Sequence, residues 1–569
     1  MKVLFAGLHL GYFRNFDSAI VELAARGHQV HLTGDETEGM GGQQLAARLA
    51  AQHPEVSWDL LPSLESEPWF DGARRLRVAL DYVRVLAPGY PRKLRVRAEA
   101  RTARLVRWGS RVLGHRLTRW LLIRFERLMP VSPALVEYVR RQQPDLVVLT
   151  ALTYSRSQQL DLFKAARALR LPVAAAIMSW DHLSSKALLH MAPDRVIVWN
   201  DVQKGEAVTM HGLAESSIVA TGAQCYDQWF ERAPHRTRDE FCREFGLRPD
   251  RPFVLWVHSA LSPTPEPPEP ELVVRWIEAL RRHADPRLRE AGVLVRPHPE
   301  RLKEWAGIDL ARFDNVAFHG GNPIDARSRD DYFDSLFHAG AVAGLVTSAF
   351  LEAAVVGRPV LTFTLPEYRM HQEEMLHFRY LQTVAGGLLH EADDFEGHFR
   401  QLAEALALSG ARDERNRAFI TAFIRPAGIE TPATPAFADA IEAAARMPAP
   451  RDTQQGRPAW LAGLATAAAS SSRSGIGRWL MNDHRADVWD EHEEQTRQAV
   501  ADRQQAKEAH HQFKARRKVW RRRRDVALAV GKRLKSTWRK ARHRVAVTVY
   551  RLLYVTGVRR RELPGTGKD

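Results

Sequence analysis

Short apolar runs alternate with helical patterns along the first 235 residues. The opening segment, Lys2–Ala6, is continuous and apolar, as expected for a strand buried on both faces. Residues 15–26 place apolar side chains at i, i+3 and i+4, which predicts a helix that Gly27 ends. The other strands predicted here are Gln29–Thr33, Asp145–Thr150, Val173–Met178, Arg195–Trp199 and Ile218–Thr221. Strands that alternate with helices predict a parallel sheet covered on both faces.

A second series of the same kind follows and stops near residue 430. Its predicted strands are Pro252–Val257, Gly292–Arg296, Val316–Phe318, Ala341–Leu345 and Pro359–Phe363. Its predicted helices are Glu271–His283, Tyr332–His338 and Ala349–Val356. We therefore expect an α/β protein with two doubly wound, Rossmann-like domains, 1–235 and 236–445. A linker, 446–476, and a basic helical extension, 477–569, would follow.

The composition is globular, with 45% hydrophobic and 26% charged residues, but the net charge of +16 is concentrated in two segments. Residues 514–544 hold fifteen Lys and Arg against one acid, and residues 72–127 hold sixteen against three. Such segments attract phosphate-rich surfaces, either anionic lipid or nucleic acid.

Within residues 101–125 an apolar stripe at helical spacing is flanked by arginines. This pattern is typical of a helix that lies in a membrane interface, or of a core helix with a solvated basic face. The stripe comprises Leu105, Trp108, Val112, Leu113, Leu117, Trp120 and Leu121.

The basic tail allows two partners. Trp520 and Trp538 could stack on nucleic-acid bases, but the tail lacks a recognised reading motif. The apolar stretch Val545–Val555 favours a membrane surface instead. We expect the protein to bind an anionic membrane surface through residues 72–127 and 514–555, with nucleic acid as the alternative partner. The chain shows no apolar run of the roughly 18–20 residues that a membrane span needs, no secretory leader and only two cysteines. These features predict a cytosolic protein that can attach to the inner membrane face.

Polar and charged residues follow three predicted strands of the second domain, where open α/β sheets bind ligands. Hydroxyl groups that open a helix can surround an anion, and a guanidinium offers a charged fork to phosphate oxygens. Each feature alone fits an ordinary turn or helix cap, but together at one sheet edge they predict a diphosphate site. The candidate ligands are His258, Ser259, Arg296, His298, Thr347, Ser348 and Glu352.

The first domain offers candidates for a catalytic base. His9 follows the first strand between glycines, where an imidazole can reach an acceptor hydroxyl. Asp181 follows the strand at 173–178 and would lie in an interdomain cleft. Asp17 is a further candidate, although an acid in a first helical turn usually compensates the helix dipole. We expect no metal and no resident cofactor, because the sequence has no HExxH motif, cysteine cluster or Walker A pattern.

These features resemble the GT-B fold of glycosyltransferases, in which the second of two doubly wound domains holds a nucleotide diphosphate. Residues 331–360, from Asp-Tyr-Phe-Asp-Ser-Leu to Gly-Arg-Pro-Val, are similar to the donor-binding strand–helix–strand of that fold. Arg-Pro-His-Pro at 296–299 resembles a stretch of bacterial surface-carbohydrate enzymes, including CDP-glycerol glycerophosphotransferases and capsule sugar transferases. Residues 179–186 and 423–428 are similar to further segments of that group. The resemblance covers about residues 1–445.

The resemblance implies a glycosyltransferase of bacterial surface-polysaccharide assembly, with a nucleotide-sugar or CDP-alditol donor and a glycan or lipid-linked acceptor. Arg296, His298, Thr347, Ser348 and Glu352 would then hold the donor's phosphates and ribose. Many retaining enzymes of this fold carry two glutamates eight positions apart, but the position eight before 352 is a glycine, which leaves the stereochemistry open. Three alternatives remain: a CDP-glycerol-type glycerophosphotransferase, a nucleotide-sugar 2-epimerase of the same fold, and a non-enzymatic basic adaptor that binds membrane or nucleic acid.

Overall fold

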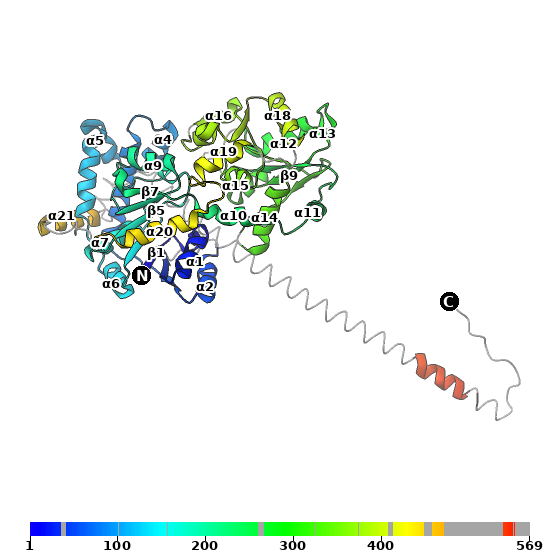
Figure 1. Cartoon of the computed structure of the whole chain (residues 1–569), viewed down its shortest axis with the longest axis horizontal. Helices are drawn as coiled ribbons and strands as arrows, with labels where there is room; N and C mark the ends of the chain where they lie inside the picture. Colours follow the sequence, from blue (N-terminus) through cyan, green and yellow to red (C-terminus); the bar gives the residue numbers. More distant parts are fainter. Residues whose placement is uncertain are drawn as a thin grey trace. The chain divides into compact units, whose positions relative to one another are not determined.

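Two parallel β-sheets, each covered by helices, build the first unit of the chain, Met1–Ala486 (Figure 1). The second unit is Asp487–Asp569. The structure is a computed structural model, and it describes residues 1–35, 41–100, 102–155, 157–259, 267–321, 323, 325–373, 375–407, 414–448, 458–471, 539–549 and 551. The prediction of two doubly wound α/β domains is confirmed.

The first sheet has seven parallel strands in the order β3-β2-β1-β4-β5-β6-β7. Val3 pairs with Val30 on one side and Leu146 on the other, so the strand order reverses between β1 and β4. The strands are β1 Lys2–Ala6, β2 Gln29–Gly34, β3 Val56–Leu60, β4 Leu146–Leu149, β5 Val173–Ala176, β6 Arg195–Val198 and β7 Ile218–Ala220. The helices of this part are η1 Leu10–Asn15, α1 Asp17–Ala25, α2 Gly42–Gln52, α3 Phe70–Val85, α4 Arg92–Ala100, α5 Arg104–Leu128, α6 Pro133–Gln142, α7 Gln159–Ala168, α8 His182–Ser185, α9 Asp201–Thr209, η2 Glu215–Ser217, η3 Gln224–Tyr226 and α10 Asp227–Glu231.

The second sheet has six parallel strands in the order β10-β9-β8-β11-β12-β13, and its order reverses between β8 and β11. The strands are β8 Phe253–Val257, β9 Gly292–Arg296, β10 Val316–Phe318, β11 Ala341–Gly344, β12 Val360–Phe363 and β13 Leu389–Ala392. The helices are α11 Arg238–Phe245, α12 Glu269–Arg281, α13 Pro286–Arg289, η4 Pro299–Trp305, α14 Ala326–His338, α15 Ala349–Val355, α16 Pro366–Glu373, α17 Phe378–Thr383, η5 Val384–Gly386, α18 Phe395–Ala407 and α19 Glu414–Phe423.

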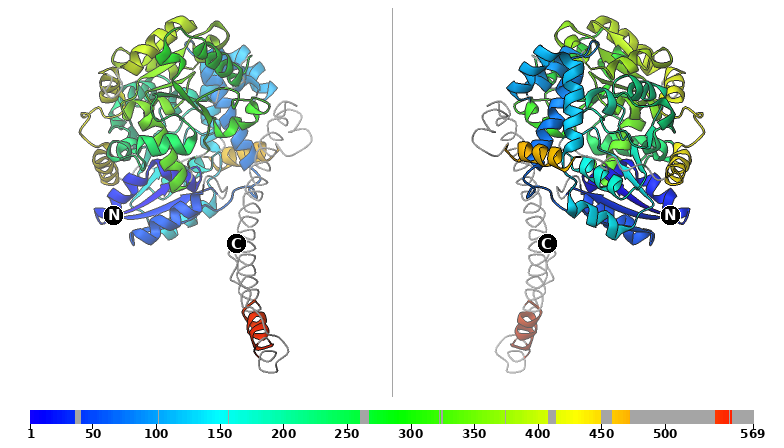
Figure 2. Two further views of the ribbon diagram at one scale, coloured as in Figure 1. Left: turned by 90° about the vertical axis from the view of Figure 1, so that its right-hand side faces the viewer. Right: turned by 90° about the vertical axis from the view of Figure 1, so that its left-hand side faces the viewer.

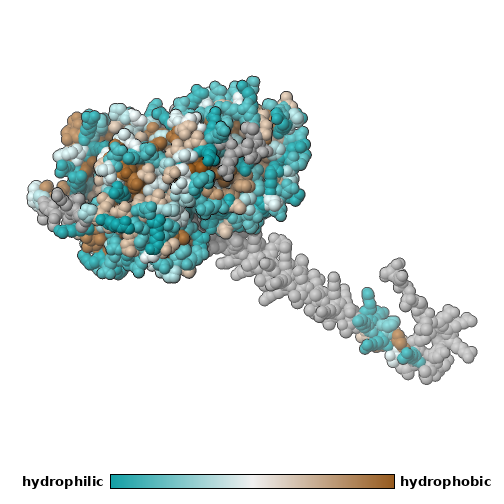
Figure 3. All heavy atoms as spheres, in the orientation of Figure 1, coloured by the Kyte–Doolittle hydropathy of each residue, from teal (hydrophilic) through white to brown (hydrophobic). Residues whose placement is uncertain are grey.

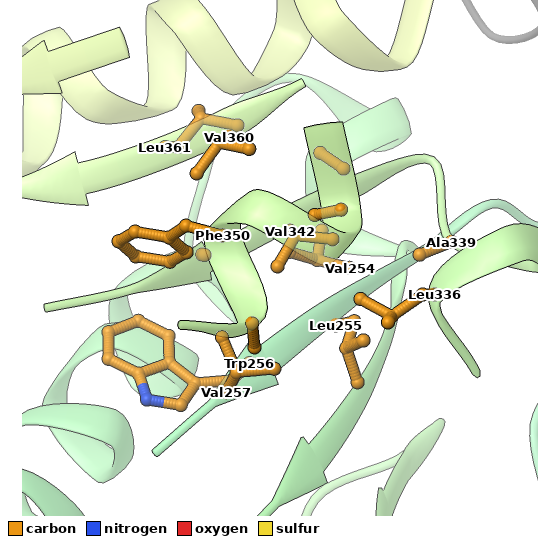
Figure 4. Packing of buried hydrophobic residues seen from close by; sticks show 14 of the residues in the cluster. Val254, Leu255, Trp256, Val257, Leu336, Ala339, Val342, Phe350, Val360 and Leu361 are labelled. Atoms are coloured by element: carbon orange, nitrogen blue, oxygen red, sulfur yellow. The ribbon is translucent and has the colours of Figure 1, made fainter. Parts of the chain in front are cut away.

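The central strands of the second sheet are apolar along their whole length because helices cover both faces. Leu255, Val342 and Val360 are register partners on β8, β11 and β12 (Figure 4). The indole of Trp256 packs against that of Trp276 on α12, with ring centres 5.2 Å apart. Both indoles are fully buried, so this sheet presents a rigid edge to the loops beyond it.

Two strands, β3 and β13, were not predicted from the sequence, and both are edge strands. Val56–Leu60 reads Val-Ser-Trp-Asp-Leu, and Leu389–Ala392 reads Leu-His-Glu-Ala. An edge strand is paired on one side only and keeps polar side chains, so its apolar run is short and interrupted.

The last helix of the predicted second domain packs on the first sheet. Helix α20, Ala433–Ala445, buries Phe437 and Ile441 in the first domain's core, and Figure 1 shows it in yellow on that side. The aromatic rings of Phe437 and Phe16 lie 5.9 Å apart. Residues 433–445, predicted to belong to the second domain, therefore complete the first.

Part of the predicted linker, residues 446–476, is also a packed helix. Helix α21, Ala459–Ser470, buries Ala465 and Ala469 against α3. Gly72 on α3 permits this contact, since a Cβ there would lie 2.4 Å from the carbonyl oxygen of Ala469.

The predicted basic extension, 477–569, lies outside the described residues except for 539–549, which are helical, and 551. In the parts of the chain that the structure describes, no helix is both long and apolar enough to cross a membrane.

Candidate functional site

A cleft of about 410 Å³ opens beyond the carboxyl ends of β8, β9 and β11, where the strand order of the second sheet reverses. The first domain contributes Arg14, Asp17 and Trp180 to its walls. Among the lining residues, four arginines face two carboxyl groups, so the cleft favours an anion. The arginines are Arg14, Arg232, Arg296 and Arg329, and the acids are Asp17 and Glu352.

Arg296 is the last residue of β9 and lies in the floor of this cleft. It is 7% exposed, and its guanidinium carbon lies 4.9 Å from the centre of the Tyr332 ring. Its Nη1 is buried and has no hydrogen-bond partner among the described residues. Burial also lowers the pKa of this guanidinium, since the charged form loses water. Because buried polar groups are usually paired, the unpaired Nη1 of Arg296 is available to an anion that enters the cleft.

Gly320 leaves room for this guanidinium. The glycine follows β10, and a Cβ added to it would lie 3.0 Å from Cζ of Arg296. A larger residue there would push the guanidinium out of its position.

Glu352, on α15, is the carboxyl group that faces this cation. It accepts a hydrogen bond from the hydroxyl of Tyr332. Burial raises its pKa to about 7, although the positive charges of Arg14 and Arg296 oppose the shift. The side chain therefore exchanges its proton near neutral pH.

Thr347 and Ser348 line the cleft at the start of α15, at the strand end where the sequence placed them. The hydroxyl of Thr347 accepts the N–H of Ala349 at 3.3 Å. Ser348 is exposed. Because α15 is only seven residues long, Arg296 rather than the helix end is the main positive charge at this edge.

His258 also lines the cleft, and its imidazole is neutral. Its Nδ1 accepts a hydrogen bond from Nε1 of Trp305 at 3.1 Å, which leaves the proton on Nε2. That Nε2 lies 3.6 Å from carboxylate oxygens of both Glu269 and Glu304. Burial lowers the pKa of His258 to about 3, so the ring is neutral. Nδ1 also faces the backbone N–H of His298, at 3.5 Å, and His298 itself lines the cleft.

Ser259, predicted as a ligand, does not line the cleft. Its hydroxyl accepts the N–H of Val346 at 3.0 Å, and its own N–H donates to Glu269. The side chain therefore ties the end of β8 to the segment after β11. The neutral form of Glu269 is favoured here, since burial raises its pKa to about 7.

The two predicted catalytic residues, His9 and Asp181, also lie outside the lining of this cleft. His9 follows β1, where the first sheet reverses its order, and its ring centre is 4.4 Å from that of Tyr12. Burial lowers the pKa of His9 to about 4, and no described residue is hydrogen-bonded to its buried Nδ1. A neutral imidazole can accept a proton.

Asp181 is a poor base because its carboxylate is already occupied. The hydroxyls of Ser179 and Ser185 donate to it at 2.7 and 2.8 Å, and Nζ of Lys186 lies 3.8 Å away. These partners hold the pKa of Asp181 well below its usual range. The geometry fits a residue that positions the loop after β5.

Asp17 does line the cleft. Burial raises the pKa of its carboxyl group, and Arg48 lies 3.3 Å away.

Sequence reasoning missed Arg14, Trp180 and Trp229, which also line the cleft. Arg14 lies at the end of the short helix η1, and no motif distinguishes it. Trp229 lies in the segment between the domains, with its ring 5.8 Å from that of Tyr332. Gly344 cannot be replaced by the glutamate of retaining enzymes, since a Cβ there would lie 2.6 Å from the carbonyl oxygen of Val257.

A larger cavity, of about 810 Å³, lies at the opposite ends of the strands, beside Pro252 and Gly340. Arg238 donates to backbone carbonyls there, and Arg251 pairs with Glu290 at 2.7 Å, although Nε of Arg251 and Nε of Arg358 are buried without a hydrogen-bond partner among the described residues. The smaller cleft is the candidate site, because it lies beyond the carboxyl ends of the strands, where open α/β sheets bind ligands. Among the described residues, no group of three or more His, Cys, Asp or Glu side chains could hold a metal ion.

No family model matches the chain, and no curated protein sequence is similar to it. Similar solved structures include a glycosyltransferase from Rickettsia africae, with 10% identity and a TM-score of 0.46 over 79% of this chain and 99% of that one. Another is UDP-GlcNAc 2-epimerase from Neisseria meningitidis bound to UDP-GlcNAc, with 11% identity and a TM-score of 0.43 over 78% and 100%. A third is Arabidopsis thaliana UGT89C1 complexed with UDP, with 11% identity and a TM-score of 0.45 over 78% and 99%.

Proposed function

We propose that the protein is a glycosyltransferase that moves a sugar from a nucleotide-activated donor to an acceptor. The observation that carries this proposal is Arg296, a buried guanidinium with an unused N–H at the switch point of a parallel sheet. A diphosphate would pair with it and remove the cost of the unsatisfied group.

The cleft supplies groups for each part of such a donor. Arg296 would hold the diphosphate, together with the hydroxyls of Thr347 and Ser348. Glu352 would accept from a ribose hydroxyl, as the resemblance implies. Arg14, from the first domain, would add a second positive charge beside the donor's diphosphate.

The chemistry would be a displacement at the anomeric carbon. The acceptor oxygen bonds to that carbon, the bond to the diphosphate oxygen breaks, and the electron pair leaves with the nucleoside diphosphate. The arginines would stabilise the charge that develops on the leaving group. A first-domain base, His9 or Asp17, would take the acceptor's proton.

The test is a thermal-shift screen against UDP-, GDP-, CMP- and CDP-linked donors, followed by turnover assays with and without acceptor glycans. We expect one nucleotide to raise the melting temperature, because a ligand that binds only the folded state stabilises it. Turnover that needs an acceptor supports a transferase, whereas conversion of the donor alone would indicate a 2-epimerase. No shift with any donor would contradict the proposal and favour a non-enzymatic adaptor.

We further propose that the acceptor is a glycan or lipid-linked intermediate of bacterial surface-polysaccharide assembly on the cytoplasmic side of the membrane. The likeness of Arg-Pro-His-Pro at 296–299 to surface-carbohydrate enzymes supports this substrate class. A CDP-alditol donor is the alternative, and the CDP arm of the same screen would identify it.

A further inference from the structure

Exposed apolar side chains are concentrated on one part of the first domain. Of the fifteen exposed large hydrophobic residues in the described part of the chain, ten lie on α4, α5 and α21. We call these ten the α5–α21 surface. They are Val96, Leu105, Trp108, Val112, Leu113, Leu117, Trp120, Leu121, Trp460 and Leu464.

Helix α5 is oriented with its polar stripe inward. Ser110, Thr118 and Glu126 are buried, whereas Trp108 and Val112 are each 63% exposed. The helix is kinked at Gly114, and Glu126 anchors its second half, since it pairs with Lys164 at 2.6 Å beneath the helix. The structure therefore excludes the alternative of a core helix with a solvated basic face.

Helix α21 extends the same surface from more than three hundred residues further along the chain. It lies against α3 and α5 (Figure 2). Its small residues Ala465 and Ala469 face inward, while Trp460 and Leu464 are 66% and 60% exposed. Figure 3 shows hydrophobic patches on the side of the first unit where Figure 1 places α5.

The charge around this surface is positive. Five arginines of α5 are exposed, whereas the one acid of that helix, Glu126, is buried. The guanidinium of Arg124 lies over the Trp120 ring, 5.1 Å from its centre. The exposed arginines are Arg104, Arg111, Arg116, Arg124 and Arg127.

We propose that the α5–α21 surface docks on an anionic lipid bilayer. Tryptophan and aliphatic side chains enter the boundary between headgroups and acyl chains, and arginines beside them reach the lipid phosphates. A protein partner with an acidic rim would match the charge as well, but tryptophans bordered by arginines along an exposed helix are typical of the lipid interface. This inference rests on the surface alone and does not depend on the proposed function.

The experiment is co-sedimentation of the full-length protein with vesicles, because the chain also carries a basic tail. The test variant is Trp108→Ser/Val112→Ser/Trp120→Ser. The matched control is Leu302→Ser/Phe318→Ser, which removes exposed apolar groups outside the surface. We expect the test variant to bind vesicles of phosphatidylglycerol and phosphatidylcholine at least about tenfold more weakly than wild type, since each buried CH₂ contributes to partitioning. The control should bind like wild type.

A second variant, Arg116→Ala/Arg124→Ala, tests the charge. Its affinity for the anionic vesicles should fall about fivefold per arginine removed at low salt, and the difference from wild type should shrink at high salt. Pure phosphatidylcholine vesicles should bind wild type weakly. Melting curves of all variants confirm that they are folded.

Equal binding of wild type and the triple variant would overturn the proposal and assign lipid binding to the tail. A wild-type dimer in sedimentation velocity that the triple variant abolishes, without a difference in vesicle binding, would assign the surface to a second copy of the chain.

Discussion

Arg296 and Glu352 determine the chemistry of the cleft at the scale of single residues. Folding buries the guanidinium and leaves Nη1 unused, while the nearby carboxyl group has a pKa of about 7. An incoming diphosphate would meet a fixed positive charge and a carboxyl group that can be neutral. Both properties follow from burial rather than from composition.

Arg296→Ala is the first test of this pair. A hydrogen bond to a charged group contributes about 1.5–3 kcal/mol, so donor binding should weaken by roughly 10- to 100-fold. The fold should remain, because no described residue loses a hydrogen bond to Nη1. Calorimetric titration of the donor measures the effect, with Arg282→Ala, whose side chain is 76% exposed, as the control. Unchanged affinity in Arg296→Ala would show that the diphosphate lies elsewhere.

Glu352 should make donor binding depend on pH. Its folded pKa, about 7, lies above the ordinary value of 4.5, so the neutral form dominates below pH 7. Above pH 7 the carboxylate repels the diphosphate and competes for Arg14 and Arg296. Affinity for a nucleotide diphosphate-sugar, which itself has no proton to lose in this range, should therefore fall by up to about tenfold per pH unit above 7. Titrations at pH 6, 7 and 8 test this, and Glu352→Gln should remove the dependence.

Residues at strand ends could be predicted, but the direction of their side chains could not. Arg296, His298, Thr347, Ser348 and Glu352 share the cleft because parallel strands end at one edge. Ser259 follows a strand as well, yet its hydroxyl turns inward to Val346. Arg14 was missed because it comes from a short 3₁₀ helix, and such helices have no periodic pattern long enough to detect.

At the scale of elements, a buried cluster of charges joins α3, α5 and α7. Arg77 donates to both carboxylate oxygens of Asp161, at 2.8 and 2.6 Å, and also to Glu126. Lys164 donates to Glu126 at 2.6 Å. The basic segment 72–127 is therefore only partly a surface feature, since Arg77 and Arg84 are buried.

Glu126→Ala should destabilise the first domain. It leaves Arg77 and Lys164 without their shared partner, and breaking a buried pair costs about 3–5 kcal/mol. Denaturant unfolding measures the free energy, with the exposed neighbour Arg127→Ala as the control. The positive charges lower the pKa of Glu126 to about 2. Its contribution to stability is thus present above pH 4.5 and is lost as the pH falls toward 2, so wild type and Glu126→Ala should converge in acid.

Three strands agree with the structure to the residue. Lys2–Ala6 and Gly292–Arg296 are paired on both sides and almost wholly buried, whereas Val316–Phe318 is an edge strand. Residues 433–445 were placed in the second domain and 446–476 in a linker, but α20 packs on the first sheet and α21 packs on α3. The sequence does not show which surface a distant helix will cover.

At the scale of the whole molecule, the chain returns from the second domain to the first over residues 425–434, and this segment is held by the carboxylate of Asp227. This carboxylate accepts two hydrogen bonds from Arg425, at 3.0 and 2.7 Å, and the backbone N–H groups of Ala433 and Thr434. The crossing fixes α20 on the first sheet and closes the unit that holds the cleft.

A chain truncated after Ser471 should bind the donor with wild-type affinity, because every residue that lines the cleft lies between Arg14 and Glu352. It should also keep part of the vesicle binding, since the α5–α21 surface remains. Calorimetry and co-sedimentation check the two outcomes separately. Loss of donor binding with an unchanged melting temperature would mean that the removed residues reach the cleft.

The central claim is that a nucleotide-activated sugar binds with its diphosphate on Arg296. The most direct measurement is a crystal structure of the protein with the donor that gives the largest thermal shift. The account predicts a phosphate oxygen within hydrogen-bond distance of Nη1 of Arg296, about 2.7–2.9 Å, with Glu352 beside the ribose. A diphosphate bound elsewhere, with Nη1 of Arg296 still unpaired, would contradict it.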